Sequence, residues 1–209
     1  MKRGRARSRK EEDRKVADLL HELGQLKRVQ RSGWWLCGVK QAESVAEHTF
    51  RTAAIAYVLG ELEGADSARA AAIALFHDLA EARVNDAHRL ARRYASSWRR
   101  VERAAERDQL AGLPAALRSD LSGLLAEARS PRSLEARIAK DADRLECLIQ
   151  AREYEAQGVP AREWIESSLR DLQTRTAKRI AGAVLRTKPS SWRAGTQPAS
   201  PRRRGRASR

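Results

Sequence analysis

The chain has 209 residues and a formal net charge of +15, with only six prolines, twelve glycines and two cysteines. This length favours one domain with a substantial core, and the composition favours helix over strand. No stretch is apolar for long enough to span a membrane, no secretory signal is evident, and two distant cysteines give no disulfide framework. These features exclude membrane and disulfide-rich classes and predict a cytoplasmic protein.

The positive charge is concentrated at the two ends of the chain. Residues 1–10 and 193–209 each hold six Lys or Arg and no acid, whereas residues 11–192 hold 30 basic and 27 acidic residues, a net +3. We therefore predict disordered basic tails at 1–10 and 193–209 around one folded domain at 11–192. The tails are expected to bind polyanions weakly at most, and the balanced body does not indicate a basic nucleic-acid groove.

All the predicted elements are helices. A first helix starts near Glu11 and is interrupted at Gly24, and the stretch 28–43, with two adjacent tryptophans, indicates a long connection of a kind that often carries function. Ser44 and Glu47 have the spacing of a capping box. Turn and cap signals then delimit further helices at about 44–62, 67–81, 88–111, 114–128, 132–157 and 161–185. No alternating strand pattern is present, so the fold class is all-α.

Three of these helices carry candidate metal ligands. His77 and Asp78 lie in the apolar run AAAIALFHDLAEA, His48 lies near the start of EHTFRTAAIAYVL, and Asp143 lies in KDADRLECLIQ. Two imidazoles and two carboxylates from three helices can enclose one divalent ion. Glu81, one turn beyond His77, can reach a metal-bound water.

The residues alone leave alternatives open. His48 could be a satisfied core histidine, and Asp143 could form an ordinary surface ion pair. Asp141 competes with Asp143 as a ligand, and spacing does not choose between them. Glu47 could orient His48 from behind or serve only in the capping box.

Three segments in this order carry a family resemblance: GVKQAESVAEHTFR, AIALFHDLAEARVND and KDADRLECLIQAREYE. They resemble the HD-domain metal-dependent phosphohydrolases over roughly residues 19–157, and LKRVQRSGWWLCGV is similar to the opening loop of the 5′-deoxynucleotidase branch of that family. The resemblance implies a single HD-domain helical bundle with a metal site between helices. It also implies a metal-dependent 5′-nucleotidase that acts on (deoxy)nucleoside 5′-monophosphates, and we expect a homodimer.

The resemblance further implies one divalent transition metal, which could be Mn, Co, Fe, Ni or Zn. Its ligands would be His48, His77, Asp78 and Asp143. Asp141 then falls where the family tolerates other residues.

For the substrate, the resemblance implies that Glu81 handles the proton of the attacking water and that Asp86 acts near the sugar. Arg31 would contact the phosphate, and Trp34 would pack against the deoxyribose. Asn85 stands where the family usually has glycine, and AHRLARRY replaces a segment richer in proline, beside the substrate pocket. These departures leave open another phosphoester, such as a nucleotide second messenger. A non-catalytic RNA-binding module is the third alternative, and the complete set of site residues argues against it.

Overall fold

The computed structural model describes residues 2–195, with side chains described for residues 9–194. Within this range the chain is helical, and its only pairing of strand type is an isolated antiparallel bridge between Gln30 and Ser44. The α-helices are α1 (Lys2–Leu23), α2 (Val45–Glu63), α3 (Ser67–Phe76), α4 (Glu81–Val84), α5 (Arg89–Tyr94), α6 (Trp98–Leu110), α7 (Ala115–Arg129), α8 (Leu134–Glu155), α9 (Arg162–Asp171) and α10 (Arg175–Arg186). Short 3-10 helices are η1 (Gly24–Lys27), η2 (Ser32–Cys37) and η3 (Ser191–Gly195). The all-α prediction is confirmed.

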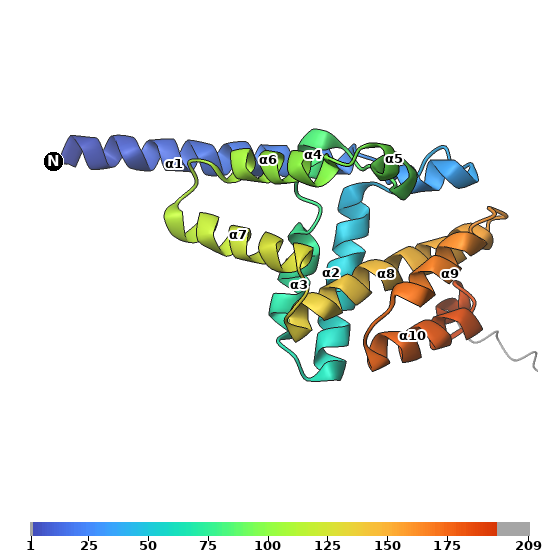
Figure 1. Ribbon diagram of the computed structural model, residues 1–209. Coiled ribbons are helices and arrows are strands. Elements are labelled where there is room, and N and C mark those ends of the chain that lie inside the picture. Colours follow the sequence, from blue (N-terminus) through green and yellow to red (C-terminus); the bar gives the residue numbers. More distant parts are fainter. Residues whose placement is uncertain (1, 196–209) are drawn as a thin grey trace, which may run out of the picture.

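The main core lies where α2, α3 and α8 pack together, with α9 and α10 against α8 (Figure 1). Leu59, Ile73 and Leu145 are each about 1% exposed in this core. α2 and α3 approach closely at Gly60, because a Cβ there would lie 2.7 Å from the Cα of Ser67. α2 and α3 therefore pack closely as a pair, and α8 crosses both of them. The candidate site lies on these three elements.

A second, smaller core joins α1, α6 and α7. Its buried residues are Leu19, Leu79, Leu110, Leu113, Leu121 and Leu125. Figure 1 shows α1 running beside α6 and extending past it toward the N-terminus. Leu79, from the turn after α3, belongs to this second core, so the turn that follows α3 packs against these helices.

Several helix boundaries differ from the predicted ones. The region 161–185 contains two helices, because Thr174 caps the start of α10 by accepting a hydrogen bond from the backbone N–H of Ala177. The region 88–111 is likewise divided, into α5 and α6. α3 ends at Phe76 and gives way to a turn before α4, which begins at Glu81.

The two ends of the chain bear on the predicted tails. α1 begins at Lys2, so residues 2–10 continue a helix where the sequence predicted a disordered tail, because Lys and Arg have good helix propensity. Residues 196–209, most of the second predicted tail, lie outside the described residues. Between residues 2 and 195, no helix combines the length and apolar character needed to cross a bilayer.

Candidate metal centre and active site

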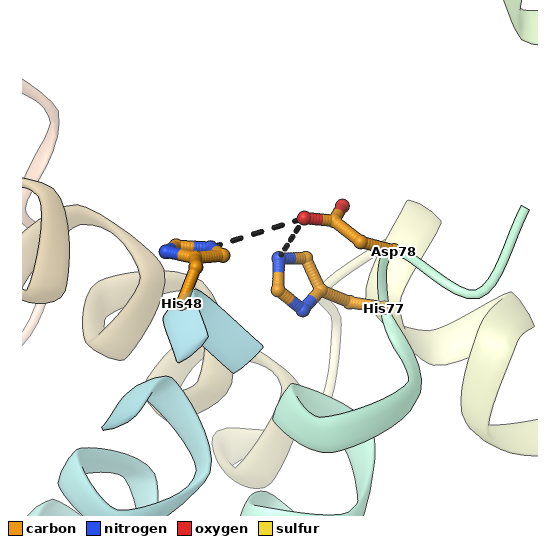
Figure 2. Close-up of side chains that lie close together, drawn as sticks. All are labelled: His48, His77 and Asp78. Atoms are coloured by element: carbon orange, nitrogen blue, oxygen red, sulfur yellow. Dashed lines mark ion pairs between the residues drawn. The ribbon is translucent and has the colours of Figure 1, made fainter. Parts of the chain in front are cut away.

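The four predicted ligands converge from three elements. His48 lies in the first turn of α2, His77 and Asp78 directly follow α3, and Asp143 lies on α8. Asp78 Oδ2 is 3.8 Å from His48 Nε2 and 3.2 Å from His77 Nε2 (Figure 2). Asp143 Oδ1 is 3.5 Å from His48 Nε2 and 4.0 Å from His77 Nε2. The structure therefore brings together all four side chains, although Asp143 is far from the others in sequence.

Both histidines are held with the same nitrogen facing the cluster. The Nδ1 of His77 lies 2.6 Å from the carbonyl oxygen of Ala74, which can only accept, so Nδ1 carries the hydrogen. The Nδ1 of His48 lies 2.6 Å from Glu146 Oε2. His48 is completely buried, and its Nε2 has no hydrogen-bond partner among the described residues. An unpartnered buried imidazole nitrogen that faces two carboxylates fits a metal ligand.

The charges of the cluster also favour a cation. Burial and Arg31 lower the pKa of His48, but the carboxylates of Glu146 and Asp143 outweigh them and raise this pKa to about 10. Burial raises the pKa of Asp143, but Lys140 and the two site histidines outweigh it and hold the pKa of this carboxyl well below its usual range. The site thus stabilises positive charge between ionised carboxylates, and the donor set of two nitrogens and two oxygens fits a divalent transition metal.

Glu146 is a site residue that the sequence analysis missed. Its Oε2 contacts His48, and its Oε1 accepts hydrogen bonds from Arg51 Nε at 3.0 Å and from an Arg51 terminal nitrogen at 2.7 Å. Arg51 is in turn held by Glu153 and Gln150. Glu146 lies one turn after Asp143 on α8, and this i, i+3 spacing is the signal that could have found it.

Asp141 and Glu47, which the sequence left open as site residues, have other hydrogen-bond partners in the structure. Asp141 is fully buried away from the cluster and accepts the backbone N–H groups of Gln173 at 2.8 Å and Thr174 at 2.7 Å. Glu47 forms the capping box with Ser44, and it is Glu146 that contacts the ring of His48. Asp141 and Glu47 thus stabilise the backbone, and Asp143 is the acid that lies beside the two histidines.

Arg31 and Asp86 adjoin the ligand cluster. A terminal nitrogen of Arg31 lies 3.3 Å from Asp78 Oδ2 and 3.7 Å from Asp86 Oδ1. Asp86 is fixed from the other side by Ser32, whose backbone N–H and hydroxyl both donate to Oδ2, at 2.6 and 3.1 Å. The loop before α2 and the segment after α4 are therefore joined at the site.

Glu81 is buried beside them, at 2% exposure, and neither of its carboxylate oxygens has a hydrogen-bond partner among the described residues. Arg92 forms an ion pair with it, with a nitrogen 3.6 Å from Oε1. Burial and the carboxylates of Asp78 and Asp86 raise the pKa of Glu81 well above its usual range. A buried carboxyl with a raised pKa holds a proton more readily than an exposed one, as a group that takes a proton during a reaction must.

Trp34 is both a core residue and a pocket residue. It is 3% exposed, stacks on Trp164 with ring centroids 5.8 Å apart, and meets Tyr154 edge-on at 5.0 Å. Its Nε1–H donates to Glu43 Oε1 at 3.0 Å. Any contact that it makes with a ligand is therefore made by an edge of a firmly packed ring.

A pocket of about 800 Å³ lies over these groups. Its walls include seven of the eight predicted site residues, all but His48. The site therefore faces a space large enough for a small organic molecule.

Asn85, between Glu81 and Asp86, has a φ of +61°. Glycine adopts this region at little cost, whereas other residues rarely do. The backbone at this position explains why glycine is usual there in the family that the sequence resembles.

Known proteins are similar to this chain in sequence and in fold. Over 141 residues the chain is 36% identical to 5′-deoxynucleotidase HDDC2 of Danio rerio, and this aligned region covers 67% of this chain and 70% of that protein. It is 35% identical to the human protein of the same name, over 68% of this chain and 69% of the relative. A conserved hypothetical protein from Pyrococcus furiosus superposes with a TM-score of 0.71 at 33% identity, over 82% of this chain and 99% of that one.

The family model described as the HD domain matches residues 23–185, which include the whole ligand cluster and the helices that carry it. With this match and these relatives, the chain belongs to the HD domain family.

Proposed function

We propose that this chain is a metal-dependent phosphomonoesterase that removes phosphate from deoxynucleoside 5′-monophosphates. The convergence of His48, His77, Asp78 and Asp143 beneath a pocket carries this proposal. Support also comes from the relatives that bear the name 5′-deoxynucleotidase and match about two thirds of the chain. A phosphate monoester would place its phosphate over the ligand cluster and its nucleoside in the remaining space of the pocket.

We propose that the four ligands hold one divalent ion, which could be Mn, Co, Fe, Ni or Zn. When bound, such an ion supplies charge neutralisation at a phosphate oxygen and lowers the pKa of a coordinated water. The histidines are oriented for this by Glu146 and by the carbonyl of Ala74, which leave each Nε2 free to bind.

Arg31 would bind the phosphate. It now lies between Asp78 and Asp86, and its planar guanidinium can hold two phosphate oxygens at once. Once Asp78 is engaged by a cation, a phosphate would be the natural new partner for Arg31. Its charge would offset the charge that develops on the phosphate oxygens.

Glu81 would act as the general base and relay for the water proton. Its raised pKa and unpartnered oxygens suit a carboxylate that takes a proton during the reaction. Arg92, at 3.6 Å, would balance the negative charge of the ionised form.

Asp86 and Trp34 would position the sugar. Ser32 fixes Asp86 Oδ2, which leaves Oδ1 directed toward Arg31 and the site. The edge of Trp34 would form an apolar wall near C2′. A close wall disfavours a ribose hydroxyl only moderately unless a polar group is left unpaired, so a preference rather than an absolute selection is expected.

We also propose that two copies of the chain associate. The side chains on one face of α2 support this, because Phe50 is 73% exposed and Tyr57, Val58 and Leu62 are each about half exposed along the same stripe. Light scattering of the purified protein, with Phe50→Ser and Val58→Ser together as the disrupting variant, tests whether this face joins two copies. A monomeric parent protein would remove the proposal.

Two further proposals concern the surroundings of the protein. The unpaired thiols of Cys37 and Cys147 support a location in the reducing cytoplasm. Weak polyanion binding by residues 1–10 and 193–209 is proposed from their charge alone, and a filter-binding assay with RNA at two salt concentrations, with and without these residues, tests it.

A phosphate-release screen tests the central proposal. Metal-free protein is supplied with each candidate metal in turn and assayed against all deoxynucleoside and ribonucleoside monophosphates and against other phosphoesters. We expect release from deoxynucleoside 5′-monophosphates with at least one metal, and none from the same protein with His77→Ala. Activity confined to a diester or a diphosphate would refute the proposed substrate class.

A further inference from the structure

Three of the arginines that line the pocket besides Arg31 lie on three different helices. Arg89 begins α5, Arg144 lies on α8 directly after Asp143, and Arg170 lies in the last turn of α9. Asp171 joins the three elements, because its Oδ2 is 2.7 Å from an Arg89 terminal nitrogen and 3.7 Å from Arg144 Nε. We call Arg89, Arg144 and Arg170 the arginine rim.

The arginine rim carries more positive charge than its surroundings neutralise. Asp171 is shared between Arg89 and Arg144, and Arg170 forms no ion pair among the described residues. Glu163, an exposed acid on α9, also lines the pocket. Three guanidiniums against the one carboxylate that pairs with them leave a net positive charge at this wall of the pocket, where it can attract an anion.

The proposed reaction does not need this charge. A nucleoside 5′-monophosphate carries one phosphate, and Arg31 with the metal ligands accounts for it. The pocket volume of about 800 Å³ also leaves space beyond a mononucleotide, since small-molecule pockets start at about 300 Å³. The arginine rim thus provides charge and space for a second anionic group.

We propose that the arginine rim is an anion subsite, and that the preferred substrates are deoxynucleoside 5′-monophosphates that carry a second phosphate on the 3′ oxygen. This inference rests on the proposed function. In such a nucleotide the 5′ phosphate is the one that is cleaved, and the 3′ oxygen is the only other sugar oxygen that can carry phosphate. The chemistry is shared by a nucleoside 3′,5′-bisphosphate and by the 5′ end of a short oligonucleotide.

The test compares three substrates with the metal-loaded protein: deoxyadenosine 5′-monophosphate, deoxyadenosine 3′,5′-bisphosphate and a 5′-phosphorylated dinucleotide. We expect kcat/KM to be at least about tenfold higher for one or both of the substrates with a 3′ phosphate, mainly through a lower KM. If kcat/KM rises for the bisphosphate alone, the subsite binds a terminal phosphate. If kcat/KM rises equally for the bisphosphate and the dinucleotide, the subsite binds any 3′ phosphoryl group.

Variants then locate the effect. Arg170→Gln and Arg89→Gln should each lower the preference for the 3′-phosphorylated substrate by about tenfold, because each removes a charge-assisted contact. Arg118→Gln is the matched control, since Arg118 is an exposed arginine on α7 outside the pocket and its loss removes the same net charge. An equal loss of preference in Arg118→Gln would show a general charge effect and overturn the subsite.

The outcomes also separate this inference from the proposed function. If the 5′-monophosphate is hydrolysed at least as well as both 3′-phosphorylated substrates, the subsite is refuted and the phosphomonoesterase remains. If none of the three substrates releases its 5′ phosphate with any metal, the proposed function itself fails.

Discussion

Glu146 Oε2 lies 2.6 Å from Nδ1 of His48, and both side chains are completely buried. Arg51 binds the other oxygen of Glu146 through two nitrogens, so the carboxylate cannot turn away from the ring. The contact fixes both the orientation of the imidazole and the nitrogen that carries its hydrogen. His48 is therefore positioned from α8, the same helix that supplies Asp143.

Glu146→Gln tests this arrangement. We expect metal affinity to fall about 10- to 100-fold. The carboxylate holds the ring in place and makes Nε2 a better electron-pair donor to a metal, and the amide does both less well. Competition with a chelating dye measures the affinity, and circular dichroism checks the fold.

Glu47→Gln is the control for this prediction. Glu47 adjoins His48 in sequence but serves in the capping box, where glutamine can take the same place, so its replacement should change stability little and leave metal affinity unchanged. If Glu47→Gln loses metal as strongly as Glu146→Gln, orientation by Glu146 is not the cause.

Asp143 and Asp141 should respond in opposite ways to substitution by alanine. Asp143→Ala removes a proposed ligand, so metal content should fall from about one ion per chain to near zero while the fold survives. Asp141→Ala leaves two buried backbone N–H groups without their acceptor, which should cost about 2–4 kcal/mol and leave bound metal largely in place. Elemental analysis measures the metal content, and thermal melting measures the stability of each variant. Retention of metal in Asp143→Ala would contradict the ligand set.

The helices and the ligand cluster were predictable from the sequence because local signals mark them. The capping box at Ser44 and Glu47 fixes the start of α2, and this places His48 in the first turn. The apolar run that ends at His77 and Asp78 is similarly plain. The order of the three motifs then supplied the resemblance that joined Asp143 to them.

Other features depend on contacts between distant segments. Glu146 looks like any acid on a charged helix until α2 is packed against α8. The break between α9 and α10 depends partly on Asp141, which lies 32 residues before Gln173 and accepts its N–H. Trp34 was predicted as a sugar wall, but no local pattern shows that Trp164 and Tyr154 enclose it. Tertiary packing decides each of these features.

Glu43 should make the stability of the metal-free protein depend on pH. Burial and the nearby carboxylate of Glu146 raise the pKa of Glu43 to about 7 from an ordinary value of 4.5. The protonated form is favoured in the folded state, so its stabilising contribution is complete below about pH 4.5 and is lost as the pH rises through about 7.

Glu43→Gln should remove this loss. We expect the variant to be more stable than the parent by about 2–3 kcal/mol at pH 8 and about equally stable at pH 4.5, since the amide oxygen can still accept from Trp34. Urea unfolding at the two pH values measures the difference. A variant that is less stable at pH 8 would show that ionised Glu43 is well compensated.

Asn85→Gly should stabilise the protein. Asn85 holds a φ of +61°, and glycine adopts this conformation without a Cβ clash, so a gain of about 1 kcal/mol is expected. Thermal melting of the variant checks it, and a lower melting temperature would mean that the entropy cost of glycine exceeds the relief of strain.

Glu81→Gln provides the reference for effects on chemistry. The amide has nearly the same shape as the carboxyl but cannot take the water proton. We expect kcat to fall by about 10²- to 10⁴-fold for deoxy and ribo substrates alike, with metal content unchanged. A uniform loss of this kind is what distinguishes a proton-handling residue from one that selects the substrate.

Trp34→Phe should alter selection instead. The smaller ring cannot fill the space against Trp164 and loses the hydrogen bond to Glu43, so stability should fall by about 1–3 kcal/mol. If the ring edge also limits the space at C2′, the ratio of kcat/KM for deoxynucleotide over ribonucleotide should fall by about tenfold. Trp35→Phe is the matched control, because Trp35 is the next residue, is 53% exposed and donates only to Gln30. A ratio that is unchanged in folded Trp34→Phe would confine Trp34 to the core and remove it from substrate selection.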